Sequence, residues 1–313
     1  MIAAVDIGGS KIAVAMVDRG GSVMARAESP TQAERGYPAA KGRIEQMLRK
    51  VSGDTGTQID GIGIGCTGPI DPFSGEIGYV NFFPNWKGEN PVADLSRTFG
   101  VPVAIENDAD AAALGEAAWG AGREKKRLIY ITVGTGIGAG FIFDGRLYRG
   151  VGQSHPEIGH HVIDPSGPKC LCGFRGCWES LAAGPAMVGW FQAQGPDHPN
   201  STDITGKKIC DLAVAGDPLA IRTVERETYY LGLGIANVIS LFVPDSIVLS
   251  GGVMQSAALF FTGIKKIVAE SCGFVPFEST DLTLASLGAD ANLIGAARVW
   301  YHRFEENGGG LAT

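Results

Sequence analysis

A group of cysteines and histidines near the middle of the chain could bind a metal ion. The segment HPEIGHHVIDPSGPKCLCGFRGCWE, residues 155–179, contains Cys170, Cys172 and Cys177, with two adjacent histidines upstream. Zn²⁺ prefers four soft or borderline ligands in a tetrahedron, and three thiolates with one imidazole supply that set. A full set leaves no position for a catalytic water. The pattern therefore predicts a closed, structural zinc site.

Two acidic residues lie in the same segment. Glu157 precedes the histidines, and Glu179 follows Cys177 by two residues. Folding round an ion would fix both carboxylates in space, as a polyol-binding site requires. The alternative is three reduced cysteines packed in a core, where free cysteine behaves as a small hydrophobic residue. Charged Lys169 and Arg175 beside the thiols favour the metal site.

Length and composition limit the class of protein. The chain has 313 residues, 45% of them hydrophobic, so we expect two domains, each with its own core. The net charge of −7, without a long basic run, argues against nucleic acid as a partner. No stretch approaches the ~18 apolar residues of a membrane-spanning helix, and the N-terminus lacks the features of a signal peptide. The sequence predicts a cytoplasmic protein without a membrane partner.

The 46 glycines are far above the average usage of roughly 7%, and many gather in turns after apolar runs. Residues 2–7 predict a buried strand, followed by a Gly-Gly-Ser-Lys turn and a second strand at 12–17. Residues 128–133 predict another strand, followed by a Gly-Thr-Gly turn and apolar residues 141–143. Such turns expose backbone N–H groups that can hold phosphate oxygens.

The two predicted hairpins are similar to each other. In both, the first glycine precedes an aspartate by ten residues, from Gly8 to Asp18 and from Gly134 to Asp144. This self-similarity predicts a duplicated domain. Two facing turns of this kind would clamp a nucleoside triphosphate between two lobes.

Candidate residues for binding an acceptor molecule lie between the hairpins. An alternating Gly/Ile strand leads into the turn that contains Gly68, a candidate acceptor-binding residue, and the polar and aromatic loop at 81–86 is of a kind that lines small-molecule pockets. Asn107 is a natural N-cap for an Ala-rich helix at 109–119, which places Asp108 in its first turn. There the helix dipole favours an ionised carboxylate. Simple capping explains the Asn-Asp pair equally well when it is taken alone.

Two further elements lie nearer the C-terminus. A short strand predicted at 246–249 ends at Gly251 and Gly252, which fit against the flat face of a base or ribose, although a plain turn explains them nearly as well. A last helix is predicted at about 292–301.

In this order and at this spacing, the segments resemble the ROK (repressor, open reading frame, kinase) family of sugar kinases. The resemblance spans residues 2 to about 300. It rests on Asp6-Ile7-Gly8-Gly9-Ser10-Lys11, Asn107-Asp108, Gly134-Thr135-Gly136, Glu157-Ile158-Gly159-His160, the cysteine run with Glu179, and Gly251-Gly252. The cysteine run is specific to that family, whereas the first glycine turn is shared across the actin, hexokinase and Hsp70 superfamily. Ser10 stands where Thr is commoner and keeps the hydroxyl.

The resemblance implies an α/β fold with two ribonuclease-H-like lobes, a duplicated domain and a cleft between the lobes. The expected smaller lobe takes residues 1–118 and about 292–305, the larger lobe takes 119–291, and 306–313 form a flexible tail. The family commonly dimerises, so a homodimer is expected.

The functional residues of the family carry over one by one. Asp108 corresponds to the catalytic base and is, with Asn107, a sugar ligand. The other residues that resemble hydroxyl-binding residues are Glu157, His160 and Glu179. Those that resemble the zinc ligands are His160, Cys170, Cys172 and Cys177, and His161 is not among them. The segments that resemble the ATP and Mg²⁺ sites contain Asp6, Gly8, Gly9, Ser10, Lys11, Gly134, Thr135, Gly136, Gly138, Gly251 and Gly252.

The implied activity is transfer of the γ-phosphoryl group of ATP, with Mg²⁺, to the 6-hydroxyl of a hexose, with glucose as the first choice. Residues 155–157 resemble fructokinases of the family and residues 176–179 resemble its glucokinases, so fructose and N-acetylmannosamine remain alternative acceptors. An alternative of another class is a sugar-responsive transcriptional regulator, which would need a DNA-binding domain before the hairpin that begins at Ile2. A sugar sensor without catalysis is a third, disfavoured by Asp108 and both hairpins.

Overall fold

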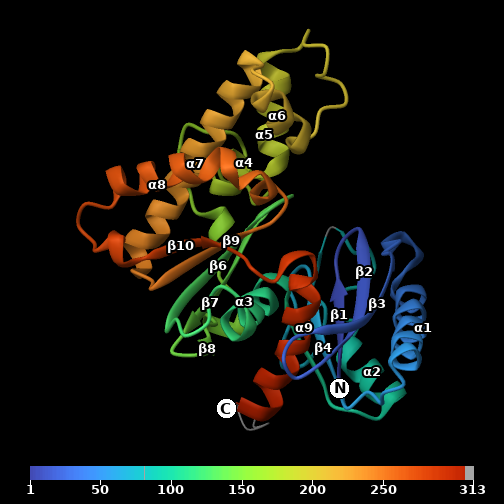
Figure 1. Cartoon of the computed structure of the whole chain (residues 1–313). Coiled ribbons are helices and arrows are strands. Elements are labelled where there is room, and N and C mark those ends of the chain that lie inside the picture. Colours follow the sequence, from blue (N-terminus) through green and yellow to red (C-terminus); the bar gives the residue numbers. More distant parts are fainter. Residues whose placement is uncertain (81, 307–313) are drawn as a thin grey trace. The chain divides into compact units, whose positions relative to one another are not determined.

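The computed structural model describes residues 1–80 and 82–306, which form two compact units (Figure 1). The first unit contains residues 1–126, 140–156 and 285–313, and the second contains 127–139 and 157–284. These bounds differ from the predicted lobes, because residues 119–126, 140–156 and 285–291 belong to the first unit. Gly140 packs against the helix that follows Asp108, so closely that an added Cβ would lie 2.5 Å from Cβ of Ala113. The second strand of the hairpin predicted at 128–143 therefore packs, from Gly140 onward, in the core of the first unit.

The first unit contains a five-stranded sheet with the strand order β3-β2-β1-β4-β5. Its strands are β1 (Ile2–Ile7), β2 (Lys11–Val17), β3 (Val23–Pro30), β4 (Gly61–Cys66) and β5 (Val103–Asn107). β1 is antiparallel to β2 and parallel to β4, so that Ile7 pairs with both Ile12 and Cys66. The strands predicted at 2–7 and 12–17 are confirmed.

The helices of the first unit are α1 (Tyr37–Thr55), α2 (Pro91–Phe99), α3 (Asp108–Trp119) and α9 (Ala291–Tyr301), with a last helical turn η7 (His302–Glu306). α3 confirms the helix predicted at 109–119. Its N-cap is Asn107, whose Oδ1 accepts a hydrogen bond of 2.9 Å from the N–H of Ala109. Glu306, the first residue of the predicted tail, is helical and pairs with Arg298. The rest of that tail, 307–313, lies outside the described residues.

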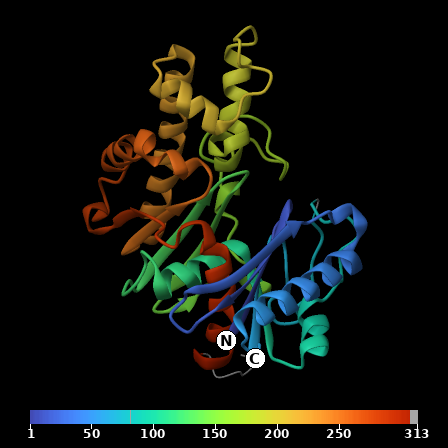
Figure 2. The same ribbon diagram turned by 45° about the vertical axis from the view of Figure 1, so that its right-hand side comes forward.

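The two faces of the first sheet are covered by different helices (Figures 1 and 2). Because side chains alternate along a strand, Val5 packs with α1 and α2, whereas Ala4 packs with α9. The glycines of β4 face α9, and an added Cβ at Gly63 would lie 1.9 Å from the carbonyl oxygen of Ala296. The Gly/Ile alternation therefore lets the backbone of α9 lie directly on the sheet.

The second sheet has the order β10-β9-β6-β7-β8. Its strands are β6 (Arg127–Val133), β7 (Ile137–Phe143), β8 (Arg146–Leu147), β9 (Ser246–Ser250) and β10 (Asp281–Leu284). If β1 to β5 are matched in chain order with β6 to β10, the two sheets have the same strand order. This agreement confirms the duplication that the two hairpins predicted.

The helices of the second unit are α4 (Trp178–Ala182), α5 (Gly184–Gln194), α6 (Gly206–Val214), α7 (Pro218–Phe242) and α8 (Ala257–Ser271). α7 is the central one, because α4, α5, α6 and α8 all contact it. Trp178 is fully buried on Gly234 of α7, where an added Cβ would lie 2.1 Å from the indole ring. Among the described residues, no helix combines the length and the apolar character needed to span a membrane.

Candidate active site and metal cluster

Asp108 is the first residue of α3 and its carboxylate is held at both oxygens. Oδ1 accepts a hydrogen bond of 2.8 Å from the N–H of Ala109, and Oδ2 accepts one of 2.6 Å from the hydroxyl of Thr67. The first turn of a helix also favours negative charge. The residue is therefore positioned by local helix geometry and by a loop 41 residues away in the chain.

A second carboxyl group, that of Asp6, lies near Asp108 at the end of β1. Burial and the charge of Asp108 together raise the pKa of Asp6 to about 7. Asn292 of α9 donates a hydrogen bond of 3.4 Å to Asp6, which opposes this effect. A divalent cation beside these two carboxyl groups would relieve their repulsion. The donor set thus fits Mg²⁺.

The first glycine turn is closed by hydrogen bonds from several elements. The N–H of Gly8 donates to the carbonyl of Lys11 at 2.9 Å, and the hydroxyl of Thr31, which follows β3, donates to the carbonyl of Gly8 at 2.6 Å. Lys11 itself extends to the surface and pairs with Glu28 at 3.3 Å. The backbone of the turn, rather than the lysine side chain, is therefore the part suited to hold a phosphate.

Gly68 lies directly after Thr67, with a φ of 98° that favours glycine. The loop at 81–86, which was predicted to line a pocket, places two of its aromatic residues in the core instead. Phe83 and Trp86 are buried in the core of the first unit, where their rings stack at 4.6 Å. Phe82 is exposed and lies beside Gly9, and Asn81 lies outside the described residues. The loop contributes mainly to the core because stacked aromatic rings bury a large area.

A buried ionic group supports the strand that ends at Asn107. Glu106 is paired with Arg149, and Arg303 lies 3.9 Å away. Burial raises the pKa of Glu106, and the two arginines oppose that effect. Both guanidinium groups also lie over the ring of Phe73, at 5.6 and 4.3 Å. Sequence reasoning missed this group because its members are far apart in the chain and match no local pattern.

The second glycine turn belongs to the second unit and contacts Glu179. The N–H of Gly134 donates to the carbonyl of Gly136 at 2.9 Å, and Oε2 of Glu179 accepts a hydrogen bond of 2.9 Å from Ile137. An added Cβ at Gly136 would lie 2.5 Å from the same oxygen. Glycine is therefore required at 136 for the carboxylate to reach the backbone.

The third glycine turn lies beside the second. The φ of Gly251 is 96°, and an added Cβ there would lie 2.3 Å from the carbonyl oxygen of Val133 at the end of β6. An added Cβ at Gly134 would be 3.9 Å from the N of Gly252. Two predicted nucleotide segments are therefore brought together in the second unit. Thr135 is exposed in the same turn, and Gly138 lies just beyond it in β7.

The predicted metal ligands form a compact cluster in the second unit. The ligand atoms of His160, Cys170, Cys172 and Cys177 all lie within 4.8 Å of one another. Sγ of Cys170 is 3.5 Å from Nδ1 of His160, and the other two thiols are 3.5 Å apart. Ligand bonds of the lengths found in zinc sites give tetrahedron edges of roughly 3.8 Å. The donors and their spacing thus fit Zn²⁺.

The surroundings of the cluster fit the same metal. A hydrogen bond from the backbone of Phe174 lowers the pKa of the Cys172 thiol, which favours the thiolate that a metal needs. His161 lies apart, with its Nδ1 against the carbonyl of Ile158 and its ring against Trp178. Cys177 is the residue that precedes α4, and Glu179 is in the first turn of that helix. The cluster therefore fixes the start of the helix that carries Glu179.

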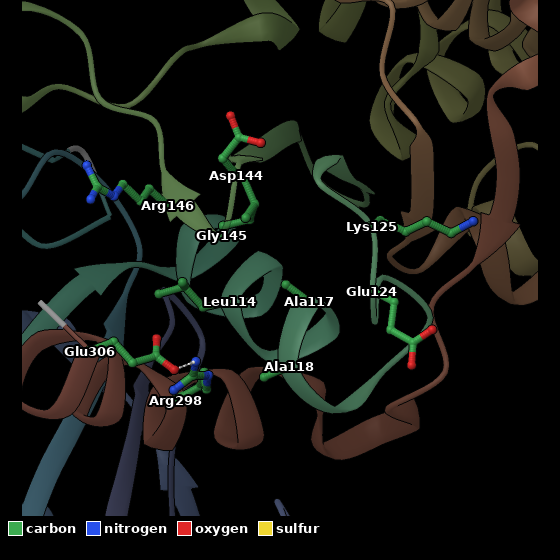
Figure 3. A pocket seen from close by; sticks show the side chains of 11 residues that line it. Leu114, Ala117, Ala118, Glu124, Lys125, Asp144, Gly145, Arg146, Arg298 and Glu306 are labelled. Atoms are coloured by element: carbon green, nitrogen blue, oxygen red, sulfur yellow. Dashed lines mark hydrogen bonds and ion pairs between the residues drawn. The ribbon is translucent and has the colours of Figure 1, made fainter.

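A pocket of about 470 Å³ lies elsewhere in the first unit (Figure 3). None of the predicted site residues lines it. Three acidic and three basic side chains surround it, and two of them, Arg298 and Glu306, are paired. Without an excess of positive charge, the pocket has no preference for phosphate. Its lining residues are Leu114, Ala117, Ala118, Glu124, Lys125, Ile142, Asp144, Gly145, Arg146, Arg298 and Glu306.

The duplicated sheets with glycine turns at their strand ends define an actin-like α/β fold of the class that includes the hexokinases. The chain belongs to the ROK family, whose model matches residues 2–303. The glucokinase of Thermotoga maritima is 31% identical over 306 residues, which cover 94% of this chain and 95% of that protein. The glucokinase of Streptomyces coelicolor is 33% identical over 309 residues, again 94% of this chain and 95% of that protein.

Solved structures agree with this assignment. The ROK hexokinase of Thermus thermophilus is 31% identical, with a TM-score of 0.83, and the match covers 97% of this chain and 99% of that one. A ROK glucokinase of Streptomyces griseus, in complex with glucose and AMPPNP, is 31% identical, with a TM-score of 0.81 and coverage of 95% and 97%. The chain is a sugar phosphotransferase of the ROK family.

The family also contains regulators. A xylose repressor of Bacillus subtilis is 32% identical over 244 residues, which cover 78% of this chain and 62% of the repressor.

Proposed function

We propose that this protein is an ATP-dependent hexose kinase that phosphorylates the 6-hydroxyl of its sugar, with glucose as the first candidate. The observation that carries the proposal is the carboxylate of Asp108, held by two hydrogen bonds beside Asp6, in a chain similar along its whole length to glucokinases. A fixed carboxylate is what an acceptor hydroxyl needs as it attacks a phosphorus atom.

Residues of the first unit act on the proton and on the metal-bound phosphates. Asp108 accepts the proton of the sugar hydroxyl, and Asn107 at the start of the same helix is a sugar ligand. Asp6 would hold Mg²⁺, and the backbone of the turn at Gly8 and Gly9 would hold phosphate oxygens. Mg²⁺, when bound, supplies the charge neutralisation that phosphoryl transfer requires.

Residues of the second unit hold the nucleotide and the sugar ring. The N–H groups at 134–136 and 251–252 suit phosphate and ribose, because these turns present bare backbone. Glu157, His160 and Glu179 are assigned to ring hydroxyls. Glu157 is exposed and the other two are half-buried, so a bound sugar would have to cover them. A polar set that is covered in this way rejects analogues that lack a partner hydroxyl.

Zn²⁺ in the cysteine cluster has a structural part in this proposal. The nitrogen of His160 nearest the cluster is Nδ1, 3.5 Å from Cys170, so a metal held there would leave Nε2 for the sugar. The metal supplies folding energy and orientation, and no bond of the substrate is broken at it.

The acceptor sugar distinguishes the proposal from its nearest alternatives. Fructose and N-acetylmannosamine are the other candidate acceptors, and the similarity to a repressor keeps a sugar-responsive regulator as the alternative of another class. The cytoplasmic location and the homodimer stay predictions.

The test is an ADP-release assay with the purified protein, ATP and a panel of hexoses and N-acetylhexosamines, with and without Mg²⁺. We expect glucose to give the highest kcat/KM, a strict requirement for Mg²⁺, and no turnover of 6-deoxyglucose. Greater turnover of fructose or N-acetylmannosamine would change the assigned acceptor. Sugar binding by calorimetry without turnover of any acceptor would favour the regulator.

A further inference from the structure

A threonine after β4 contacts the candidate base directly. The hydroxyl of Thr67 donates a 2.6 Å hydrogen bond to Oδ2 of Asp108, and the N–H of Thr67 donates a 3.0 Å hydrogen bond to the carbonyl of Ile7. One residue therefore connects the carboxylate with the strand that leads into the first glycine turn. All three residues belong to the first unit.

The orientation of the Asp108 carboxylate depends on this contact. A carboxylate at the start of a helix can rotate about its side-chain bonds, and the N–H of Ala109 restrains only Oδ1, at 2.8 Å. The same N–H also serves Oδ1 of Asn107, at 2.9 Å, so that it is shared between two acceptors. Thr67 supplies the restraint at the other oxygen. The hydroxyl has one proton, and each carboxylate oxygen has two lone pairs, so Oδ2 keeps one for an incoming proton.

A carboxylate that acts as a base must be held in one orientation, which is more than having a hydrogen-bond partner. The hydroxyl of Thr67 is a neutral donor, so it fixes the direction of the Oδ2 lone pairs without adding a charge beside Asp108. Two other groups lie close to this carboxylate. Asp6 is a nearby acid, and Cys66 is fully buried, with a thiol pKa that burial and then the charge of Asp108 raise. Thr67 is thus the neighbour that holds Oδ2 in one orientation.

We propose that Thr67 is a positioning residue for the phosphoryl transfer, acting through Asp108. The inference rests on the proposed function, since it assumes that Asp108 is the base. It assigns one effect to Thr67: it fixes the lone pair of Oδ2 that faces the sugar hydroxyl.

The experiment compares Thr67→Val, Thr67→Ala and Thr67→Ser with the wild type, by kcat and by KM for the sugar. Valine keeps the shape and removes the hydroxyl, and serine keeps the hydroxyl. We expect kcat to fall about tenfold to a hundredfold in Thr67→Val and Thr67→Ala, within the range of general-base effects, with KM changed less than about threefold. Thr67→Ser should restore kcat, because it restores the hydroxyl.

Asp108→Asn and the double variant Asp108→Asn/Thr67→Val test the role of Asp108 separately from the role of Thr67. If Thr67 acts through Asp108, the threonine substitution changes kcat little once Asp108 is an amide. If Asp108→Asn keeps the wild-type rate, the role of Asp108 is wrong and the inference about Thr67 is wrong with it. If Asp108→Asn is inactive but Thr67→Val and Thr67→Ala keep the wild-type kcat, only the inference about Thr67 is overturned. A loss of thermal stability with an unchanged kcat overturns it equally, because that is a structural role.

Discussion

The two glycine turns occupy equivalent places in the two sheets, but they have different neighbours. The first turn, at Gly8, lies in the same unit as Asp6, Thr67 and Asp108, and one side-chain hydroxyl, that of Thr31, donates to its backbone. The second turn, at Gly134, is held by hydrogen bonds between glycine backbones, including one of 2.8 Å from the N–H of Gly184. The first region is rich in acids, and the second presents bare backbone.

The strand register shows how the duplicated positions have diverged. Ile7 pairs with Cys66 in the first sheet, and Thr132 pairs with Ser250 in the second, so the next step matches Val133 with Gly251. On this register Thr67 corresponds to Gly252, and Asp6 corresponds to Thr132. The second sheet thus has glycine in place of Thr67 and an uncharged threonine in place of Asp6. The duplication therefore provides the scaffold twice, and the carboxyl groups to which we assign the proton chemistry belong to one copy.

The largest difference should appear when the acids of the two regions are changed to amides. We expect Asp108→Asn to lower kcat by about 10³-fold or more, since an amide cannot accept the proton. Glu179→Gln should lower kcat/KM by about tenfold at most, because the amide oxygen of glutamine can still accept the hydrogen bond from Ile137. Steady-state kinetics with circular dichroism of both variants checks this. Equal losses would mean that the two carboxylates share the proton chemistry.

Loss of the metal should affect the sugar-binding residues assigned to the second unit, and not Asp108 or Asp6. We expect Cys170→Ser to lose the metal, and to raise KM for the sugar about tenfold through His160 while KM for ATP changes little. The matched control is Cys272→Ala, a buried cysteine outside the cluster. Metal content by mass spectrometry and kinetics on the same preparation check the prediction. A metal-free wild type with full activity would refute the structural zinc.

A smaller effect is expected from a methyl group in the second turn. Gly136→Ala places a Cβ where Oε2 of Glu179 now lies, so this carboxylate must move. We expect KM for the sugar to rise about threefold to tenfold if Glu179 binds a hydroxyl. Gly189→Ala is the control, since an added Cβ there meets nothing within 4 Å. An unchanged KM in Gly136→Ala would remove Glu179 from the sugar ligands.

The stability of the first region should also depend on pH. The pKa of Asp6 is raised to about 7 by burial and by Asp108, so the folded state binds this proton more tightly than the unfolded chain does. Its contribution to the free energy of unfolding is present below about pH 4 and is lost as the pH rises to 7. We expect Asp6→Asn to remove a decline on the order of 3 to 4 kcal/mol over that range. Urea denaturation without Mg²⁺ measures it. Parallel curves for variant and wild type would contradict the raised pKa.

Local sequence was sufficient where a few neighbouring residues decide the structure. A glycine turn after an apolar run, an Asn before an Ala-rich stretch, and three cysteines within eight residues each have a local physical meaning, and β1, α3 and the cluster appear where these patterns predicted them. The loop at 81–86 shows the limit of such reasoning. Its aromatic residues are compatible with a pocket or a core, and only packing against α1 and the strands places Phe83 and Trp86 inside.

The sequence by itself determined the strand ends, the glycine turns, the helix that begins at Asp108 and the set of candidate metal ligands, because hydrogen bonding and backbone freedom within a short segment decide them. Only the tertiary structure decided which partners those residues meet. Thr67 contacts Asp108 across 41 residues of chain, and Arg303 reaches Glu106 from the last helical turn. Such contacts depend on how the helices pack on the sheet, and no local pattern of residues records that packing.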